Sequence, residues 1–508
     1  MKLSEYNSLK NSIFYVLSSL GFLVSYSPQQ PLFYSNQNTY LLHGLASAGY
    51  GFLQFDWLAN TKDPFPIFSF FIKVIYLLGG KFLFLILFWI FLLIYFWSLF
   101  GIIVKTLNIR SYHSKFILSL VIIFLHSSVL LSNSKTYLGT NLVSFFNDGL
   151  ANQYLVGSAF QPSIFGVFVL VSIYFFIKEK QKLSFFFLAV AVYFHTSYLL
   201  VSILILSGYV THLILSTRNF KLILKIVLFY FLLIIPIVLY YYSFTQDSEF
   251  SRNYAQEILY KYRIPQHANI RYWINVESFL KLALILFSGL LVIEKKIMPV
   301  LFIPVTIAVV LSILQYWSDN VILGILFPWR VSVVLLPLSS VIVISYLMIK
   351  LKFLVNRNLM PYLSFPVLSL IFLISIYGSK ANYHVFSKRI PSEINDVYNY
   401  IDSTKKKNDL LFIPIELEDF RLETGVPIFV DWKSHPYKPT ELVEWYERIK
   451  IAKQVIRPDS TINTAVLSKL VKEYKITYLL FDKLRSKTKS VSSFLRIYEN
   501  DRYLIIKN

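Results

Sequence analysis

Residues 82–104, FLFLILFWIFLLIYFWSLFGIIV, contain no charged side chain and decide the class of the protein. About 20 consecutive apolar residues are enough to cross roughly 30 Å of hydrocarbon as a helix. The whole chain has this character: 56% of its 508 residues are hydrophobic, 15% are charged, and the mean hydropathy is +0.57. These values exclude an ordinary soluble domain, so we expect a polytopic α-helical membrane protein.

Similar apolar stretches recur along the first 380 residues. We predict eleven transmembrane helices, at 11–27, 82–104, 116–132, 161–177, 183–197, 198–216, 223–243, 276–294, 298–316, 322–348 and 360–378. Residues 65–81 are also apolar, but a crossing there would break the charge pattern described next. We predict instead an amphipathic helix on the outer membrane interface, ended by Gly79 and Gly80.

The Lys and Arg residues indicate the orientation, because they accumulate in cytoplasmic loops. With the N-terminus inside, the inner segments hold 16 of these cations, whereas the much longer outer segments hold 8. We therefore predict a multi-pass protein of the cell (inner) membrane with a cytoplasmic N-terminus and outer loops at 28–81, 133–160 and 244–275. The net charge of +21 then serves topology and contact with anionic membrane lipid, not nucleic-acid binding.

Composition changes after Lys380, which divides a transmembrane domain, 1–380, from an extracytoplasmic α/β domain, 381–508. The pattern predicts helices at 392–403, 439–455 and 462–474 and strands at 410–413, 428–430, 478–481 and near 503–506. Strands separated by helices favour a largely parallel, Rossmann-like sheet. No glycine-rich loop follows these strands, so a nucleotide cofactor is not indicated.

Three carboxylates on the outer side are candidates for general-base chemistry: Asp56, Asp63 and Asp148. Asp56 lies between Phe55 and Trp57, an apolar setting that favours a raised pKa, but the same residue is placed to cap a helix beginning at Trp57. Asp63 before Pro64 also fits a turn or a helix cap. Asp148, in Asn-Asp-Gly, fits a turn as well as a catalytic role.

Cationic and histidine side chains suggest an anion site on the same side. Arg330 lies within an apolar span, where an arginine is costly, so it either binds phosphate or extends to the interface. The outer loop 244–275 holds Arg263, His267 and Arg271, which suit an anionic ligand or lipid head groups. His195 and His43 are candidates for substrate binding, and His195 also fits a helix-end partner.

Metal chemistry has little support from the sequence. No His, Asp or Glu cluster has metal-ligand spacing, and the absence of cysteine excludes thiolate ligands. A divalent metal ion is therefore possible but not indicated, and we predict no cofactor.

Several strings resemble the GT-C membrane glycosyltransferases, in particular an uncharacterised bacterial branch of that superfamily. They are Asn36–Gly44, Asp56-Trp57-Leu58, Asp63-Pro64, Gln161-Pro162-Ser163, Asp419-Phe420-Arg421 and Val430-Asp431-Trp432-Lys433. The resemblance implies transfer of a sugar from a polyprenyl-phosphate donor to a glycan, lipid or protein acceptor on the outer face. It implies a first-loop carboxylate as base, although Asp56 lies farther from the first helix than is usual there and no Asp-x-Asp pair is present.

Such a transfer needs a carboxylate that deprotonates the acceptor hydroxyl and a cation that holds the leaving lipid phosphate. We expect Asp56 and Arg330 to fill these roles at one site, and the C-terminal domain to carry no catalytic residue. Three alternatives remain open: a transporter or flippase of lipid-linked or anionic substrates, an O-antigen polymerase- or ligase-like enzyme, and a non-catalytic assembly protein.

The predicted topology is testable because the chain has no native cysteine. Single cysteines at Ser35, Ser134 and Ser460 should react with a membrane-impermeant thiol reagent in intact spheroplasts, since all three are predicted to face outward. A cysteine at Ser111, in a predicted inner loop, should stay protected. Labelling at Ser111 together with protection at Ser460 would reverse the orientation.

Overall fold

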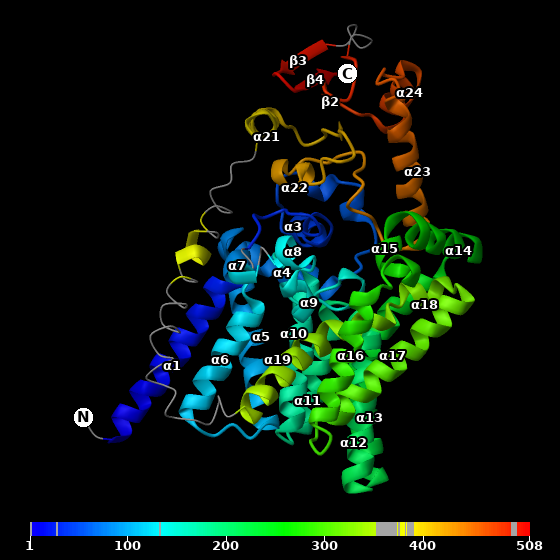
Figure 1. The fold of residues 1–508 in the computed structure, drawn as a ribbon. Helices are drawn as coiled ribbons and strands as arrows, with labels where there is room; N and C mark the ends of the chain where they lie inside the picture. Colours follow the sequence, from blue (N-terminus) through cyan, green and yellow to red (C-terminus); the bar gives the residue numbers. More distant parts are fainter. Residues whose placement is uncertain are drawn as a thin grey trace. The chain divides into compact units, whose positions relative to one another are not determined.

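The computed structural model describes residues 3–26, 29–131, 134–351, 373, 376–380, 383, 391–488 and 495–508 (Figure 1). The chain divides into two compact units. The first falls within Met1–Gln30, Leu85–Leu239 and Leu259–Phe386, and the second within Pro31–Phe84, Tyr240–Ile258 and Ser387–Asn508. One unit therefore contains both the predicted first outer loop and the C-terminal segment.

Helices make up the described part of the first unit. The longer ones are α1 (Leu3–Ser25), α5 (Phe82–Thr106), α6 (Tyr112–His126), α10 (Val167–Ile177), α11 (Gln181–Phe194), α12 (Tyr198–Thr217), α13 (Phe220–Tyr242), α16 (Val276–Leu291), α17 (Met298–Ser318) and α19 (Ser332–Lys350). Shorter turns connect them: α7 (Ser128–Leu131), α8 (Ser134–Leu138), α9 (Leu142–Asn147), η3 (Leu150–Asn152), η4 (Pro162–Gly166), η6 (Ile258–Arg263), α15 (Pro265–Ala268), η7 (Ile270–Tyr272), α18 (Val321–Ile325) and η8 (Pro328–Val331). α5 and α13 each run across a boundary between the units.

Five helical segments are long and apolar enough to cross a membrane: Phe82–Thr106, Tyr198–Thr217, Phe220–Gln246, Met298–Ser318 and Val321–Lys350. They coincide with five of the eleven predicted spans and support a helical membrane protein. Four other predicted spans correspond to shorter apolar helices, α16 has 16 residues, and 360–378 lies largely outside the described residues. The structure thus supports the class of the protein but not the number eleven.

α19 is the most enclosed of the candidate spans. In its segment 72% of the apolar window is buried, against 22% for the segment containing α13. α19 packs against α16, while α12 packs against α17 and α10 against α11 (Figure 1). Every residue from Ser332 to Val343 is buried, so the N-terminal half of α19 lies in the core of the first unit. The exposed leucines and phenylalanines of α13 are suited to lipid.

The second unit combines short helices with one small sheet. Its helices are α2 (Gln37–Tyr40), α3 (Leu42–Ser47), η1 (Leu53–Phe55), η2 (Leu58–Asn60), α4 (Pro66–Gly79), η5 (Ser243–Gln246), α14 (Glu249–Glu257), α21 (Ser392–Thr404), α22 (Phe420–Thr424), α23 (Pro439–Val455) and α24 (Thr464–Tyr474). Its strands are β1 (Leu411–Phe412), β2 (Tyr478–Asp482), β3 (Leu495–Glu499) and β4 (Tyr503–Lys507). The helices expected at 392–403, 439–455 and 462–474 are confirmed as α21, α23 and α24.

The helix expected at 65–81 is confirmed as α4. It begins at Pro66, where a missing N–H costs nothing, and it ends because Gly80 adopts a φ of +62°. Phe68 and Ile72 are buried on one side, while Phe70 and Leu78 are exposed on the other. Its position at a membrane interface stays a prediction.

The sheet has the strand order β1-β2-β4-β3 and is mixed. β1 pairs with β2 in parallel, but β4 pairs antiparallel with both β2 and β3. The expected largely parallel, Rossmann-like sheet is therefore wrong for the described strands. β3, which the pattern did not predict, is joined to β4 by only three residues, 500–502, and such a short link allows only an antiparallel hairpin.

The predicted strand at 428–430 is reduced to a single bridge between Ile428 and Leu411. The strands at 478–481 and 503–506 are confirmed as β2 and β4. Their buried side chains Leu480 and Ile505 pack with Val397 and Ile401 of α21 and with Phe420 of α22. This core holds α22 against the sheet. It thereby fixes the position of Arg421, which follows Phe420 in α22.

Candidate functional site

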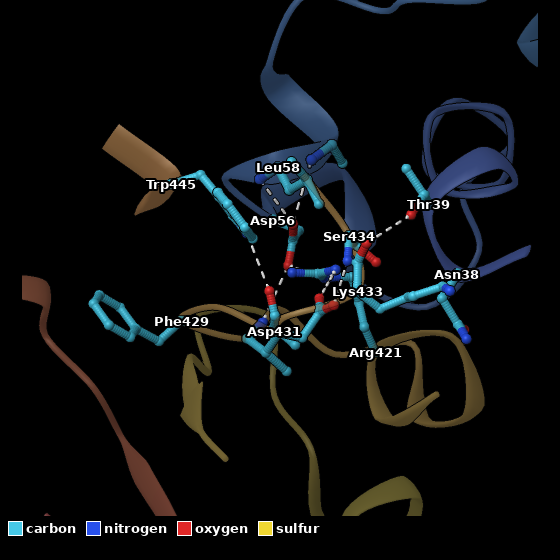
Figure 2. Close-up of polar contacts among 12 residues, drawn as sticks. Asn38, Thr39, Asp56, Leu58, Arg421, Phe429, Asp431, Lys433, Ser434 and Trp445 are labelled. Atoms are coloured by element: carbon cyan, nitrogen blue, oxygen red, sulfur yellow. Dashed lines mark hydrogen bonds and ion pairs between the residues drawn. The ribbon is translucent and has the colours of Figure 1, made fainter. Parts of the chain in front are cut away.

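Asp56 lies at the centre of a buried polar network in the second unit (Figure 2). It follows the short turn η1 in an extended conformation, and its Oδ1 accepts hydrogen bonds from the backbone N–H groups of Leu58, at 2.9 Å, and Ala59, at 3.3 Å. This is the geometry of a helix cap, here at the start of η2. Oδ1 of Asp56 therefore has the capping role that the sequence offered as an alternative.

The second oxygen of Asp56 is held by the C-terminal segment. Oδ2 accepts from Nε of Arg421 at 3.0 Å and from the backbone N–H of Ile428 at 3.1 Å. Nη1 of Arg421 also donates to Oδ2 of Asp431 at 2.6 Å, while the backbone N–H of Ser434 donates to Oδ1 at 2.6 Å. Arg421 thus bridges two carboxylates that are 365 and 10 residues away in sequence (Figure 2).

All three charged side chains are removed from solvent, with exposures of 0% for Asp56, 2% for Arg421 and 0% for Asp431. Burial disfavours the charged guanidinium, but the two carboxylates outweigh that effect and raise the pKa of Arg421. Each Asp56 oxygen already receives two donors, which fills its acceptor positions. The geometry of Asp56 is that of a structural carboxylate, and a proton acceptor would have to give up one of these donors.

Sequence reasoning did not assign a role to Arg421. The string Asp419-Phe420-Arg421 was visible, but an isolated cation beside apolar residues carries no information about a partner 365 residues away. The available signal was a charged residue between two apolar ones. Phe420 and Leu422 are core residues, and a charged side chain buried beside them must be paired.

His43 and Asp63 belong to the same unit as Asp56. Burial lowers the pKa of His43, while the nearby carboxylates of Asp63 and Asp56 oppose that shift, so a neutral imidazole is favoured at pH 7. Oδ1 of Asp63 accepts from the backbone N–H of Phe65 at 2.8 Å, which is the turn geometry that the Asp-Pro pair indicates. The structure therefore brings His43 near two of the three candidate carboxylates.

Arg330 and His195 flank one aromatic ring in the first unit. Cζ of Arg330 lies 5.3 Å from the ring centroid of Tyr198, and the ring of His195 lies 5.8 Å from it. The Tyr198 hydroxyl donates to the carbonyl of Ser163 at 2.6 Å, which fixes the ring. Cation–π contact of this kind stabilises a guanidinium without using its N–H donors.

Three N–H donors around Arg330 lack an acceptor within the described residues. They are Nε of Arg330 and the Nε1 atoms of Trp329 and Trp273, all buried. The two indole rings pack together with centroids 4.8 Å apart, and both side chains are at most 7% exposed. Buried donors without a partner cost free energy, about 1–3 kcal/mol each, unless a ligand or water accepts from them.

The loop after Asp148 packs against the two tryptophans, because Leu150 and Ala151 belong to one buried cluster with Trp273 and Trp329. The backbone N–H of Leu150 donates to Oγ of Ser332, two residues beyond Arg330, at 2.8 Å. A ring nitrogen of His267, Nδ1, donates to the carbonyl of Ala151 at 2.9 Å. Ala151 and Asn152 both adopt positive φ values, 57° and 52°, a conformation that non-glycine residues adopt at a cost.

Asp148 itself has an environment that suits proton transfer. Burial raises its pKa to about 6, against the opposing effects of a hydrogen bond with Ser144 and the charge of Lys281. Lys281 is 4% exposed and forms an ion pair with Glu277 at 2.9 Å. A carboxylate with this pKa changes its protonation state near physiological pH.

The remaining predicted residues are less central. Arg271 is exposed and lies over the ring of Tyr316, 5.6 Å from its centroid, which fits a contact at the membrane surface. Arg263 ends the π-helical turn η6, which precedes the helix carrying His267. The candidate residues divide between the two units. The first unit contains Asp148, His195, Arg263, His267, Arg271 and Arg330, and the second contains His43, Asp56 and Asp63. Among the described residues no three His, Asp or Glu side chains are grouped as metal ligands.

Comparison with known proteins adds one finding. Residues 392–452 match the model of a family described as a domain of unknown function, DUF6798. This stretch contains Arg421 and Asp431 and ends within α23. No protein of curated function matches the chain.

The buried network predicts a large stability effect from one atom change. Asp56→Asn keeps the shape but removes the charge that faces Arg421, and breaking a buried ion pair on one side costs about 3–5 kcal/mol. Thermal unfolding of the purified protein measures this loss. The control Asp402→Asn breaks an ion pair with Lys405 in which Asp402 is 66% exposed, and it should cost no more than about 1 kcal/mol. Equal effects of the two variants would contradict a structural role for the network.

Proposed function

We propose that this protein is a membrane glycosyltransferase that moves a sugar from a polyprenyl-phosphate donor to an acceptor on the outer face of the membrane. The observation that carries the proposal is the group of buried donors at Arg330, Trp329 and Trp273. An anion with several oxygens supplies the acceptors that these N–H groups lack, and a phosphate ester is such an anion.

The setting favours a phosphate that is attached to lipid. Arg330 precedes α19, whose candidate span is apolar, so a ligand at this position is within reach of hydrocarbon as well as of polar side chains. Arginine offers a planar fork of donors that matches phosphate oxygens. The proposal includes the finer topology expected from the sequence, with eleven spans, a cytoplasmic N-terminus and GT-C-like outer loops.

We assign the general base to Asp148. Asp148 lies in the same compact unit as Arg330, and its loop is bonded to Ser332 and His267. In the proposed step the acceptor hydroxyl oxygen attacks the anomeric carbon and passes its proton to the Asp148 carboxylate. The bond from that carbon to the phosphate oxygen breaks, and the lipid phosphate leaves with the electron pair while Arg330 holds it.

The base assignment departs from the expectation for Asp56. Both Asp56 oxygens are occupied by donors, whereas Asp148 has a pKa of about 6 that fits proton transfer. Catalytic roles for Asp56 and Asp63 stay predictions, and so does convergence of Asp56 with Arg330. We also propose that His195 and His267 orient substrate, since His195 contacts Tyr198 and His267 is bonded to the carbonyl of Ala151.

Arg330 variants test the phosphate assignment. Arg330→Lys keeps the charge but loses the fork, so affinity for undecaprenyl phosphate should fall about tenfold, and Arg330→Ala should lower it about 100-fold. Native mass spectrometry of the purified protein measures the bound lipid. The control Arg252→Ala, whose guanidinium donates to the backbone carbonyl of Thr245, should bind normally. Unchanged binding in Arg330→Ala would overturn the assignment, and binding without any sugar transfer would favour a flippase.

The pH dependence of transfer tests Asp148. Because burial raises the Asp148 pKa to about 6, the carboxylate is ionised above that pH and turnover should fall tenfold per pH unit below it. Asp148→Asn should abolish this acid limb and lower kcat at least about 100-fold while lipid binding persists. Transfer of radiolabelled sugar from the polyprenyl-phosphate donor measures both effects. If Asp148→Asn kept its kcat while a folded Asp56→Asn variant lost it, the general base would instead be Asp56 of the first outer loop.

A further inference from the structure

A small cavity lies at the carboxyl ends of β1 and β2 in the second unit. Its volume is about 230 Å³, and it is formed by the loop after β1, the last turns of α23 and the end of β2. The lining combines an apolar floor, chiefly Phe412, Ile413, Ala452, Ile456 and Leu480, with a charged rim. In α/β sheets, ligands bind outside the carboxyl ends of parallel strands, and β1 and β2 are the parallel pair here.

The rim alternates acceptors with donors. Glu416 and Arg485 form an ion pair of 3.2 Å whose members are both 56% exposed, so both present polar atoms to solvent at the cavity. Asp482 is fixed by Arg502, at 3.0 Å, and by the backbone N–H of Leu484, at 2.9 Å. Nε and Nη2 of Arg502 both donate to Oδ2, so the fixed carboxylate keeps one acceptor position, on Oδ1.

Lys453 completes the rim from α23. It is exposed, and its amine lies 4.6 Å from the ring centroid of Trp432. Glu416, Asp482, Lys453 and Arg485 together carry no net charge. The cavity lining therefore offers both donors and acceptors, with neither charge in excess.

These properties select a neutral ligand with an apolar face and many hydroxyl groups. A phosphate or nucleotide would face two carboxylates, and a purely apolar ligand would cover part of the charged rim without offering it a hydrogen bond. A sugar ring has one C–H face for the apolar floor and a rim of hydroxyls that both donate and accept. The volume lies below the roughly 300–1,000 Å³ of sites for drug-sized ligands, which fits a single ring.

We infer that this cavity binds one sugar unit of a saccharide. The choice of a saccharide acceptor rests on the proposed transferase function, whereas the cavity and its chemistry do not depend on it. The second unit then contributes a recognition site for the acceptor, separate in chemistry from the anion site at Arg330. No residue of the cavity is required for proton transfer.

Saturation-transfer NMR on the purified full-length protein in lipid nanodiscs tests the inference. The probes are the methyl glycosides of glucose, galactose, mannose, rhamnose and N-acetylglucosamine. At least one should bind the unaltered protein. Ala452→Met fills the floor, since Ala452 is 5% exposed and lines the cavity, and should weaken that binding at least about tenfold.

The matched control is Gln454→Met, which places the same side chain on the exposed face of α23 and should leave binding unchanged. Lys453→Ala removes a surface donor and should weaken binding severalfold even if Ala452→Met fails to fold. Absence of binding by all five glycosides, or full binding in folded Ala452→Met, would overturn the inference. Glycoside binding without any sugar transfer would overturn the transferase proposal and leave this site standing.

Discussion

The second unit depends on one buried guanidinium. Arg421 joins Asp56 from the first predicted outer loop to Asp431 from the C-terminal segment, and all three side chains are excluded from water. Charges removed from water are tolerated only when each is paired and its remaining hydrogen-bonding positions are filled. The backbone N–H groups of Leu58, Ala59, Ile428 and Ser434 meet that requirement. The network therefore fixes the conformation in which the loop around Asp56 packs against the C-terminal segment.

Close backbone contact reinforces the same connection. The N–H of Phe52 donates to the carbonyl of Gly425 at 2.7 Å, and the Tyr50 hydroxyl donates to the carbonyl of Leu422 at 2.8 Å. A Cβ atom at Gly51 would lie 2.4 Å from the Gly425 carbonyl oxygen, and both glycines have positive φ values. Only glycine combines that conformation with that approach. Charge pairing and glycine packing thus act on the same two segments.

The two units differ in how the charged side chains at their candidate sites are paired. In the second unit the buried charges of Asp56, Arg421 and Asp431 have partners, which is the pattern of a structural network. In the first unit the buried donors of Arg330, Trp329 and Trp273 lack acceptors among the described residues. Unmet hydrogen-bonding capacity in an apolar surrounding is costly, and a ligand that meets it gains the corresponding affinity. Because of this contrast, we propose lipid-phosphate binding in the first unit and acceptor recognition in the second.

The sequence by itself determined the membrane class, the position of the long apolar helices, the ends of α4 and most elements of the C-terminal segment. These follow from local causes: uninterrupted apolar length, glycine at a helix end and helical or alternating periodicity. It did not determine the sheet, because β1 has only two residues and β3 has a mostly exposed pattern, so neither carries a clear period. Nor could it pair Asp56 with Arg421, since a contact across 365 residues leaves no trace in spacing. Tertiary structure alone decided that both oxygens of Asp56 have their full set of hydrogen-bond donors. It alone decided that Nε of Arg330 is buried without an acceptor among the described residues.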